Sequence, residues 1–347
     1  RQFYEEAISL CRQKRFHEAL EKCRYTSLDD EEEYSIDVIQ PEKIEFKQNS
    51  YEDGENSIIS FPEFLLLVLD VCTGGEQPAS HYQPDKLIEK FDALKTYFTA
   101  GEFYEKMLYY RLLLDYYTIR RDIKDGQGNY SLILKGPKDD SDKLKQYQSM
   151  LYVSTEAFYN WLKPYLRKLE QDELHSCAEM LAFLKKGDNE RHSILPARKD
   201  LSYKASGNIR YWFWRLDYYL WEQRSTFFNE EEQKIVEHYV FRRNRSIEHL
   251  HPQDESHNEE WEEEAVHSFG NLAMISQSFN SQQSNDHIQI KFARIHEQIS
   301  NKSLQSIKMF LMCKLADFNY QNWTMKLAKE HENEMIEFLE RSFYISD

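Results

Sequence analysis

The sequence predicts a mainly α fold, in which a helical N-terminal and middle region is followed by a C-terminal part that adds two strands between helices. First, only 10 glycines and 8 prolines interrupt 347 residues, which favours long regular elements. Second, aromatic residues make up 14% of the chain, enough for a sizeable core. Third, apolar residues recur at helical spacing over most of residues 62–186, and the pattern changes near residue 239.

The N-terminal segment is predicted to be short helices and loops. Residues 1–24 carry apolar side chains every three or four positions, which indicates two short helices. Residues 36–46 alternate weakly and hold a candidate strand. Residues 51–57 are polar and contain a glycine, so we expect a loop or linker there.

The helical middle region begins at Ser60. This serine is a predicted N-cap, because Pro62 suits a first helical turn and Glu63 favours the positive end of a helix dipole. A short strand is expected at 130–134. The apolar spacing predicts helices over 62–72, 84–98, 101–119, 143–152, 154–169 and 171–185.

Residues 208–224 form the most aromatic stretch and are apolar nearly all round, which is typical of a helix buried between layers. Stacking of these rings on splayed bases stays open as an alternative. The stretches 239–247 and 269–276 are predicted strands. Helices are expected at 284–299, 303–316 and 322–343.

Charge and cysteine content narrow the classes of protein. A net charge of −16 counts against a general nucleic-acid binder, although a local basic surface or a metal ion can still meet phosphate. Five scattered cysteines without a C-x-x-C pair indicate reduced thiols in a cytoplasmic protein and no zinc site. No apolar run is long enough to span a bilayer, and no signal peptide is visible. Because the chain begins with Arg1, we expect a fragment or a processed product.

The residues that point most clearly to chemistry lie at the predicted strand junctions. Glu248 and His249 end the first strand, since Pro252 follows shortly after. Asn271 opens the second strand, and Asn280 precedes the next helix. Phosphodiester cleavage needs a base for water, which suits histidine, and a hard cation on oxygen ligands. His249 is therefore the candidate base, and the carboxylate and amide oxygens are candidate metal ligands.

These motifs resemble the HNH, or ββα-metal, nuclease fold, and more narrowly the C-terminal nuclease module of GmrSD-type modification-dependent restriction proteins. That module shows Glu-His-Ile-x-Pro-Gln, then Gly-Asn-Leu-x-Leu-Ile, then an Asn followed by a Phe and a Lys. The chain offers Glu-His-Leu-His-Pro-Gln at 248–253 and Gly-Asn-Leu-Ala-Met-Ile at 270–275. Asn280 follows, and Phe292 stands next to Lys291.

The resemblance implies a role for each matching residue. His249 would be the general base, Glu248 and Asn280 the ligands of Mg²⁺ or Mn²⁺, and Asn271 the residue that holds the base. The substrate would be DNA, and the biological role restriction of foreign or modified DNA in antiphage defence. No other cofactor site is implied.

The resemblance is close over 238–347 and departs from the full-length pattern in two respects. Such proteins carry a ParB-like nucleotide-binding half with Asp-Gly-Gln-Gln-Arg, whereas 125–129 reads Asp-Gly-Gln-Gly-Asn, in a predicted turn. We therefore expect that half on a removed segment or a partner chain. The first ligand is also Glu248 rather than the Asp common in HNH enzymes, although Glu is usual in this subfamily.

We accordingly expect three parts: an N-terminal helical segment and linker over 1–57, a helical domain over 58–235, and an HNH-type nuclease domain over 236–347. Two other functions stay open. The helical region from 61 to 235 could serve as a partner-binding or sensor module on a degenerate nuclease scaffold. The substrate could instead be RNA.

Several further residues lie near the motif. The candidates for contacts with the nucleic-acid backbone are Arg242, Arg243, Arg245 and Lys291. His251 is expected to be an exposed neighbour of the site, with a role as a second ligand as the alternative, and His267 is expected at the surface, where it could touch a phosphate. The acidic run at 254–264 is expected to be a solvated loop.

Overall fold

The structure is a computed structural model, and it describes residues 2–25, 54–123, 130–137, 141–154, 156–242, 246–253, 261–275, 288–301 and 303–344. Over these residues the protein is mainly helical, as the sequence predicts. The chain divides into two units. The first contains Arg1–Lys145 and Ala157–Met180, and the second contains Gln146–Glu156 and Leu181–Asp347.

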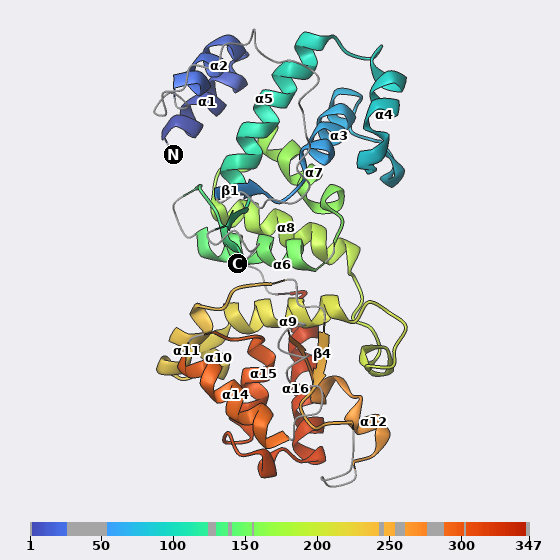
Figure 1. Ribbon diagram of the computed structural model, residues 1–347, viewed down its shortest axis with the longest axis vertical. Coiled ribbons are helices and arrows are strands. Elements are labelled where there is room, and N and C mark those ends of the chain that lie inside the picture. The colour runs from blue at the N-terminus through green and yellow to red at the C-terminus, as the bar shows by residue number, and fades with distance from the viewer. Residues whose placement is uncertain are drawn as a thin grey trace, which may run out of the picture. The chain divides into compact units, whose positions relative to one another are not determined.

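The first unit is built around the long helix α5 (Ala100–Tyr117), against which α1 (Gln2–Arg12), α2 (Phe16–Tyr25), α3 (Phe61–Cys72) and α7 (Phe158–Glu170) pack (Figure 1). The short elements η3 (Ala79–Tyr82), η4 (Pro84–Lys86) and α4 (Leu87–Leu94) follow α3. The boundary between the two units falls within α6 (Ser141–Val153) and α8 (Cys177–Arg191).

The predicted cap of α3 is confirmed. The Ser60 hydroxyl accepts a hydrogen bond from the Glu63 backbone N–H at 3.4 Å, and the Glu63 carboxylate accepts one from the Ser60 N–H at 2.7 Å. This reciprocal capping box satisfies two backbone donors that the first helical turn cannot pair internally.

The prediction of a loop over 51–57 is wrong for residues 54–57. Gly54–Ser57 forms strand β1, which pairs antiparallel with β2 (Arg120–Ile123), and β2 pairs antiparallel with β3 (Tyr130–Ile133). Backbone pairing with a neighbouring strand overrides the weak strand propensity of a polar segment. The short strand predicted near residue 130 is confirmed, whereas the candidate strand at 36–46 lies outside the described residues.

The second unit holds the two-stranded sheet and the helices that cover it. In chain order its elements are η5 (Arg198–Leu201), α9 (Arg210–Glu222), α10 (Arg224–Phe227), α11 (Glu230–Glu237), β4 (Ser246–His249), α12 (Glu263–Val266), η6 (Phe269–Asn271), β5 (Leu272–Ile275), α14 (Ile288–Ser300), α15 (Ile307–Leu315), η7 (Tyr320–Asn322) and α16 (Met325–Arg341). α9 crosses α15 and α16 and also contacts β5 (Figure 1).

The aromatic stretch is a core helix, as predicted. Every residue from 211 to 221 is buried in α9. Arg215 is fully buried as well, and its guanidinium donates to the Asp188 carboxylate at 3.1 Å, so the charge inside the unit is paired. With its faces occupied by protein, α9 does not offer its rings to nucleic-acid bases.

The two C-terminal strands are shorter than predicted. The first strand covers only Ser246–His249 (β4). At Tyr239, where the strand was predicted to begin, the backbone carbonyl accepts a hydrogen bond from the Gln146 side chain at 3.0 Å instead of pairing with a strand. The second begins at Leu272, since residues 269–271 form the single turn η6. Residues 243–245 lie outside the described part of the chain.

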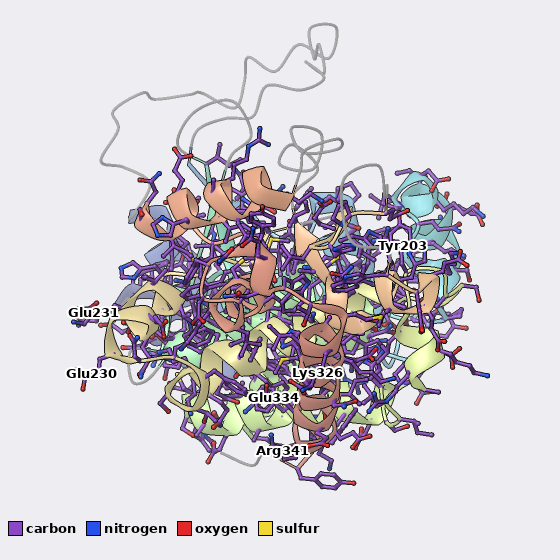
Figure 2. The ribbon with its side chains drawn as sticks, turned by 90° about the horizontal axis from the view of Figure 1, so that it is seen from below. Tyr203, Glu230, Glu231, Lys326, Glu334 and Arg341 are labelled. Atoms are coloured by element: carbon purple, nitrogen blue, oxygen red, sulfur yellow. The ribbon has the colours of Figure 1, made fainter. Side chains whose placement is uncertain are left out.

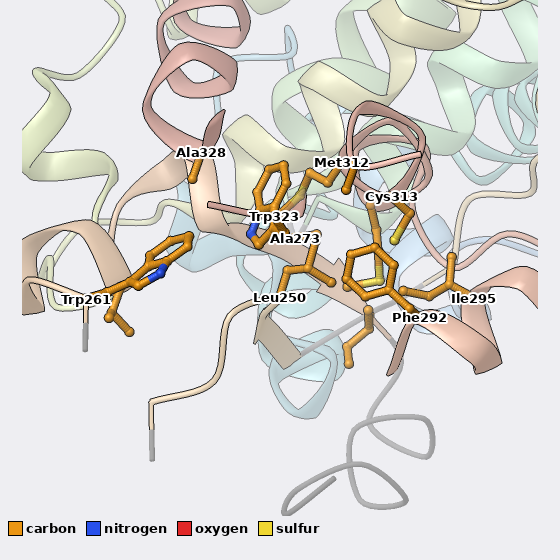
Figure 3. Packing of buried hydrophobic residues seen from close by; sticks show 13 residues of the cluster. Leu250, Trp261, Ala273, Phe292, Ile295, Met312, Cys313, Trp323 and Ala328 are labelled. Carbon is orange, nitrogen blue, oxygen red and sulfur yellow. The ribbon is translucent and has the colours of Figure 1, made fainter. Parts of the chain in front are cut away.

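A hydrophobic cluster supports the hairpin from one side. Ala273 and Ile275 of β5 pack with Phe292 and Ile295 of α14 and with Met312 of α15 (Figure 3). Alternate residues of a strand point to the same face, so this cluster defines the face of β4 and β5 that α14 covers. Among the described residues, no helix is long and apolar enough to cross a membrane.

Candidate active site

The register of the hairpin sends the two motif residues of β4 to opposite faces. Glu248 stands opposite Ala273, and His249 stands opposite Leu272. Directly opposed residues of an antiparallel pair share a face, so Glu248 points with Ala273 toward α14. His249 points the other way, toward the loop that joins β4 to β5.

The carboxylate of Glu248 meets a buried lysine from α14. Lys291 Nζ forms an ion pair with Glu248 Oε1 and donates to the backbone carbonyl of His249 at 2.9 Å. The side chains of Glu248 and Lys291 are only 9% and 6% exposed. Lys291, predicted to contact phosphate, thus bonds to the metal-ligand candidate and to the backbone of the base candidate.

His249 lies in a pocket of three side chains. Its Nε2 is 3.0 Å from Nδ1 of His267, and the amide nitrogen of Gln253 lies 2.9 Å from its Nδ1 and 3.3 Å from its Nε2. The ring of Tyr203, labelled in Figure 2, meets the His249 ring edge-on with centroids 4.6 Å apart. Together these partners hold the imidazole at both nitrogens and on its ring.

Burial, together with the nearby His267 and the Lys291 ammonium, lowers the pKa of His249 to about 3. The imidazole is therefore neutral around pH 7 and has a lone pair that can accept a proton. A neutral imidazole can accept a proton, but a pKa of about 3 makes it a weaker base near pH 7 than a histidine with the usual pKa.

Asn271 was expected to bond to the imidazole of His249, and it does not. Its Nδ2 donates to the carbonyls of His251 at 3.0 Å and Val266 at 2.8 Å. Its Oδ1 accepts from the His251 N–H at 2.8 Å and from Trp323 Nε1 at 3.1 Å. Two donors and two acceptor sites exhaust the amide, so Asn271 holds the loop that carries His249 instead of the ring itself.

The glycine before Asn271 is required by close packing. A Cβ at Gly270 would overlap the backbone carbonyl oxygen of Ala328 in α16 and lie 2.8 Å from Glu332 Cβ. The buried Lys308 completes this anchor, since its ammonium donates to the carbonyls of Phe269 at 2.8 Å and Leu272 at 2.6 Å. The turn that precedes β5 is thus fastened to both α15 and α16.

The other predicted residues are placed differently. Arg242 is exposed, whereas Arg243, Arg245 and Asn280 lie outside the described residues. The expected exposure of His251 is wrong, because its ring stacks on Trp261 at 4.1 Å and is 4% exposed. The acidic run is described only from residue 261 onward.

Three side chains around the base were missed as partners of His249. His267 was expected at the surface, yet it is only 8% exposed and contacts His249. Gln253 ends the motif Glu-His-Leu-His-Pro-Gln at 248–253, so the sequence could have indicated it as a partner of His249. Tyr203 comes from a segment far away in the chain, and nothing local in the sequence links it to the base.

A divalent cation fits this site in part. Glu248 supplies the hard carboxylate oxygen that Mg²⁺ or Mn²⁺ prefers, and such ions keep several waters, so few protein ligands are needed. Within the described residues no group of three or more His, Cys, Asp or Glu side chains is placed to bind a metal. Of the two proposed ligands, the structure describes only the carboxylate of Glu248, because Asn280 lies outside the described residues.

The comparisons with known proteins agree with the motifs. The family model that describes the C-terminal domain of GmrSD restriction endonucleases matches residues 189–338. No curated protein and no solved structure matches the chain. The match includes α9, the whole hairpin and most of α16, and it confirms the resemblance that the motifs of β4 and β5 predicted. Residues 189–338 of this chain are therefore similar to the C-terminal domain of GmrSD restriction endonucleases.

Proposed function

We propose that this chain is a metal-dependent DNA endonuclease of the HNH type that acts in restriction of foreign or modified DNA. The observation that carries the proposal is the end of β4, where a neutral, buried His249 follows Glu248 in the chain, in a segment that the model of the GmrSD C-terminal domain matches. The proposed ligands of Mg²⁺ or Mn²⁺ are Glu248 and Asn280. A ParB-like nucleotide-binding domain or subunit, outside this chain, is the proposed partner.

In the proposed hydrolytic step, His249, Glu248 and a divalent cation each have one task. The imidazole of His249 takes a proton from water as the water oxygen attacks phosphorus, because its pKa keeps the ring neutral near pH 7. A divalent cation, when bound, would stabilise the charge on the phosphate and on the departing oxygen. Glu248 would hold that cation, which would compete with the Lys291 ammonium that is paired to Oε1 of the same carboxylate.

The loop between β4 and β5 keeps these parts in place. Asn271 bonds to both the backbone N–H and the backbone carbonyl of His251, so the segment after His249 stays next to the start of β5. A misplacement of about 1 Å can cost about 100-fold in rate, which explains why a buried asparagine is used there.

The experiment compares nucleic acids and metals side by side. The full chain is incubated with supercoiled plasmid, unmodified or base-methylated, and with structured RNA, each with Mg²⁺, Mn²⁺ or EDTA. We expect nicking of DNA that needs the metal and that Glu248→Gln abolishes. Glu230→Gln is the matched control, because Glu230 projects from the start of α11 into solvent (Figure 2).

Binding of Mn²⁺ is measured on the same proteins by electron paramagnetic resonance. Wild type and Glu230→Gln should bind the ion, and Glu248→Gln should bind it more weakly. Cleavage of RNA alone would assign the site to RNA. No cleavage of either polymer together with no bound Mn²⁺ would overturn the proposal and favour a partner-binding module on a nuclease scaffold.

A further inference from the structure

A groove in the second unit carries cations that the sequence motif does not include. Lys291, which was predicted to contact phosphate, is 6% exposed and paired with Glu248, so it does not face a nucleic acid. The groove has a volume of about 310 Å³ and is lined by residues of η5, of α12 and of the start of α16. We call it the η5–α16 groove.

The cations of the η5–α16 groove come from two segments that are far apart in the chain. They are Arg198 and Lys199 of η5, and Lys326 and Lys329 of α16, and all four are exposed. Arg198 fastens η5 to α16, because its guanidinium lies 3.7 Å from the Glu332 carboxylate and donates to Oδ1 of Asn333. Among the described residues, Lys199 and Lys329 take part in no ion pair, so their charges are available to a ligand.

The start of α16 adds to the positive potential of the groove. This helix has 17 residues and no acidic residue in its first turn. The positive end of a helix dipole attracts anions and repels lysine, yet Lys326 and Lys329 stand in the first two turns. Glu330, 3.7 Å from Lys326, offsets part of that repulsion. An anion in the groove would be stabilised by the lysines and by the helix end together.

The groove ends beside the candidate base. Two serines line it, Ser202 and Ser268, and each is next in the chain to a residue that contacts His249. Tyr203 follows the first serine, and its ring centroid lies 4.6 Å from that of His249. His267 precedes the second, with its Nδ1 3.0 Å from Nε2 of His249. The Ser202 hydroxyl also donates to the His267 carbonyl at 3.0 Å, so the two walls meet at this point.

The third wall of the groove is acidic. Glu262 and Glu264, at the start of α12, are exposed and line it. Their carboxylates repel a polyanion, whereas the cations of η5 and α16 attract one. A phosphate chain would therefore lie against η5 and α16 and away from α12.

We propose that the η5–α16 groove binds the phosphate backbone of DNA next to the phosphate that is cut, with Lys199, Lys326 and Lys329 as the contacts. Arg198 is a positioning residue that holds η5 against α16. This inference rests on the proposed nuclease function for the identity of the polymer. Binding to the groove itself needs neither metal nor cleavage.

The test measures how salt weakens DNA binding. Fluorescence anisotropy follows a labelled DNA duplex with the full chain in EDTA, from 50 to 200 mM salt. One variant is Lys326→Gln with Lys329→Gln, and a second is Glu262→Gln with Glu264→Gln. Lys186→Gln with Lys234→Gln is the matched control, because it removes the same charge at two exposed lysines of the second unit that do not line the groove.

Each lost phosphate contact lowers the slope of log affinity against log salt by about 0.9. The variant at Lys326 and Lys329 should thus lose about 1.8 of slope, and its deficit against wild type should shrink by about tenfold between 50 and 200 mM salt. The variant at Glu262 and Glu264 should bind DNA more tightly than wild type. The control should keep the wild-type slope.

Three results would overturn the inference. They are a wild type that does not bind the duplex at 50 mM salt, a slope in the variant at Lys326 and Lys329 equal to that of the control, and weaker binding by the variant at Glu262 and Glu264. If the wild type binds DNA with the expected slopes but does not nick it with Mg²⁺ or Mn²⁺, the proposed nuclease function fails and the groove stands. Nicking by a wild type whose slope does not depend on the two lysines would leave the nuclease in place and reject the groove.

Discussion

The side chain of Asn271 and the backbone of His251 form a closed pair, in which Nδ2 donates to the His251 carbonyl at 3.0 Å and Oδ1 accepts from the His251 N–H at 2.8 Å. This pair fastens the segment after β4 to the start of β5. The Trp323 indole N–H adds a third anchor, from the segment before α16. The motif asparagine is thus a structural clamp immediately behind the base.

Asn271→Ala should destabilise this hairpin by about 2–4 kcal/mol, because it leaves buried carbonyl and N–H groups of the loop without partners. The measurement is hydrogen exchange on peptides from residues 246–253 and 261–275, with urea unfolding of the full chain. Asn333→Ala is the control: its amide meets only Arg198 at the surface, and a change within about 0.5 kcal/mol is expected. Wild-type protection in Asn271→Ala would show that the clamp is dispensable.

Gly270→Ala and Gly187→Ala should change stability in opposite directions. At Gly270 the added methyl meets the α16 backbone, so overpacking should cost about 1–3 kcal/mol. At Gly187, inside α8, a Cβ meets only the flexible end of Arg191 at 3.3 Å, and the higher helix propensity of alanine should add about 0.5–1 kcal/mol. The comparison uses urea midpoints, and equal shifts in the two variants would refute the packing argument.

The ion pair between Glu248 and Lys291 should show strong coupling in a double-mutant cycle. Each single change to leucine should cost about 3–5 kcal/mol, because it leaves a buried charge without its partner. The double variant should cost at least about 1 kcal/mol less than the sum.

The exposed pair Lys326–Glu330 at 3.7 Å is the control for that cycle, with an expected coupling of at most about 0.5 kcal/mol. The side chain of Lys326, which is labelled in Figure 2, is 86% exposed. Stability is read from urea unfolding near pH 7. Strict additivity for Glu248 and Lys291 would mean that the pair does not form in solution.

Stability should fall when the pH drops below about 6.5. His331 is fully enclosed, its two ring nitrogens lack hydrogen-bond partners among the described residues, and burial beside Lys308 holds its pKa well below the usual value. Below pH 6.5 the unfolded chain binds a proton that the folded chain does not, so the free energy of unfolding decreases. For one such histidine the loss from pH 6.5 to pH 5 is about 1.5 kcal/mol.

His331→Leu should flatten that pH dependence by about this amount, as measured by urea unfolding at several pH values. His238→Leu, at an exposed histidine, should leave the slope unchanged. A slope that His331→Leu does not alter would place the acid sensitivity elsewhere, with the buried His249 as the next residue to test, since its pKa is also depressed.

The sequence predicted those parts of the fold that depend on local patterns. The aromatic helix α9, the helices that follow the hairpin and the cap at Ser60 all follow from periodicity and short-range chemistry. Strand β1 did not, because a polar tetrapeptide becomes a strand only through pairing with a segment some 65 residues away, as with Gly54 and Ile123.

In the candidate site, too, the features that depend on local patterns were predicted and those that depend on distant parts of the chain were not. Glu248, His249 and Asn271 were found from their order and their place at strand ends. Their surroundings were not, because the partners of the imidazole are set by how the loop folds back and by the turn at Tyr203. The two ends of the loop meet only in three dimensions, so His267 looked like an ordinary surface histidine in the sequence.

Chemical rescue of His249→Ala tests the central claim most directly, namely that this imidazole is the base of a hydrolytic centre. Nicking of supercoiled DNA with Mg²⁺ or Mn²⁺ is followed in single-turnover reactions, and Mn²⁺ binding and hydrogen exchange verify that the variant keeps its fold and its ion. We predict that nicking falls by about 10²–10⁴-fold and that added free imidazole restores part of it. Nicking by His249→Ala at the wild-type rate without imidazole would contradict the account.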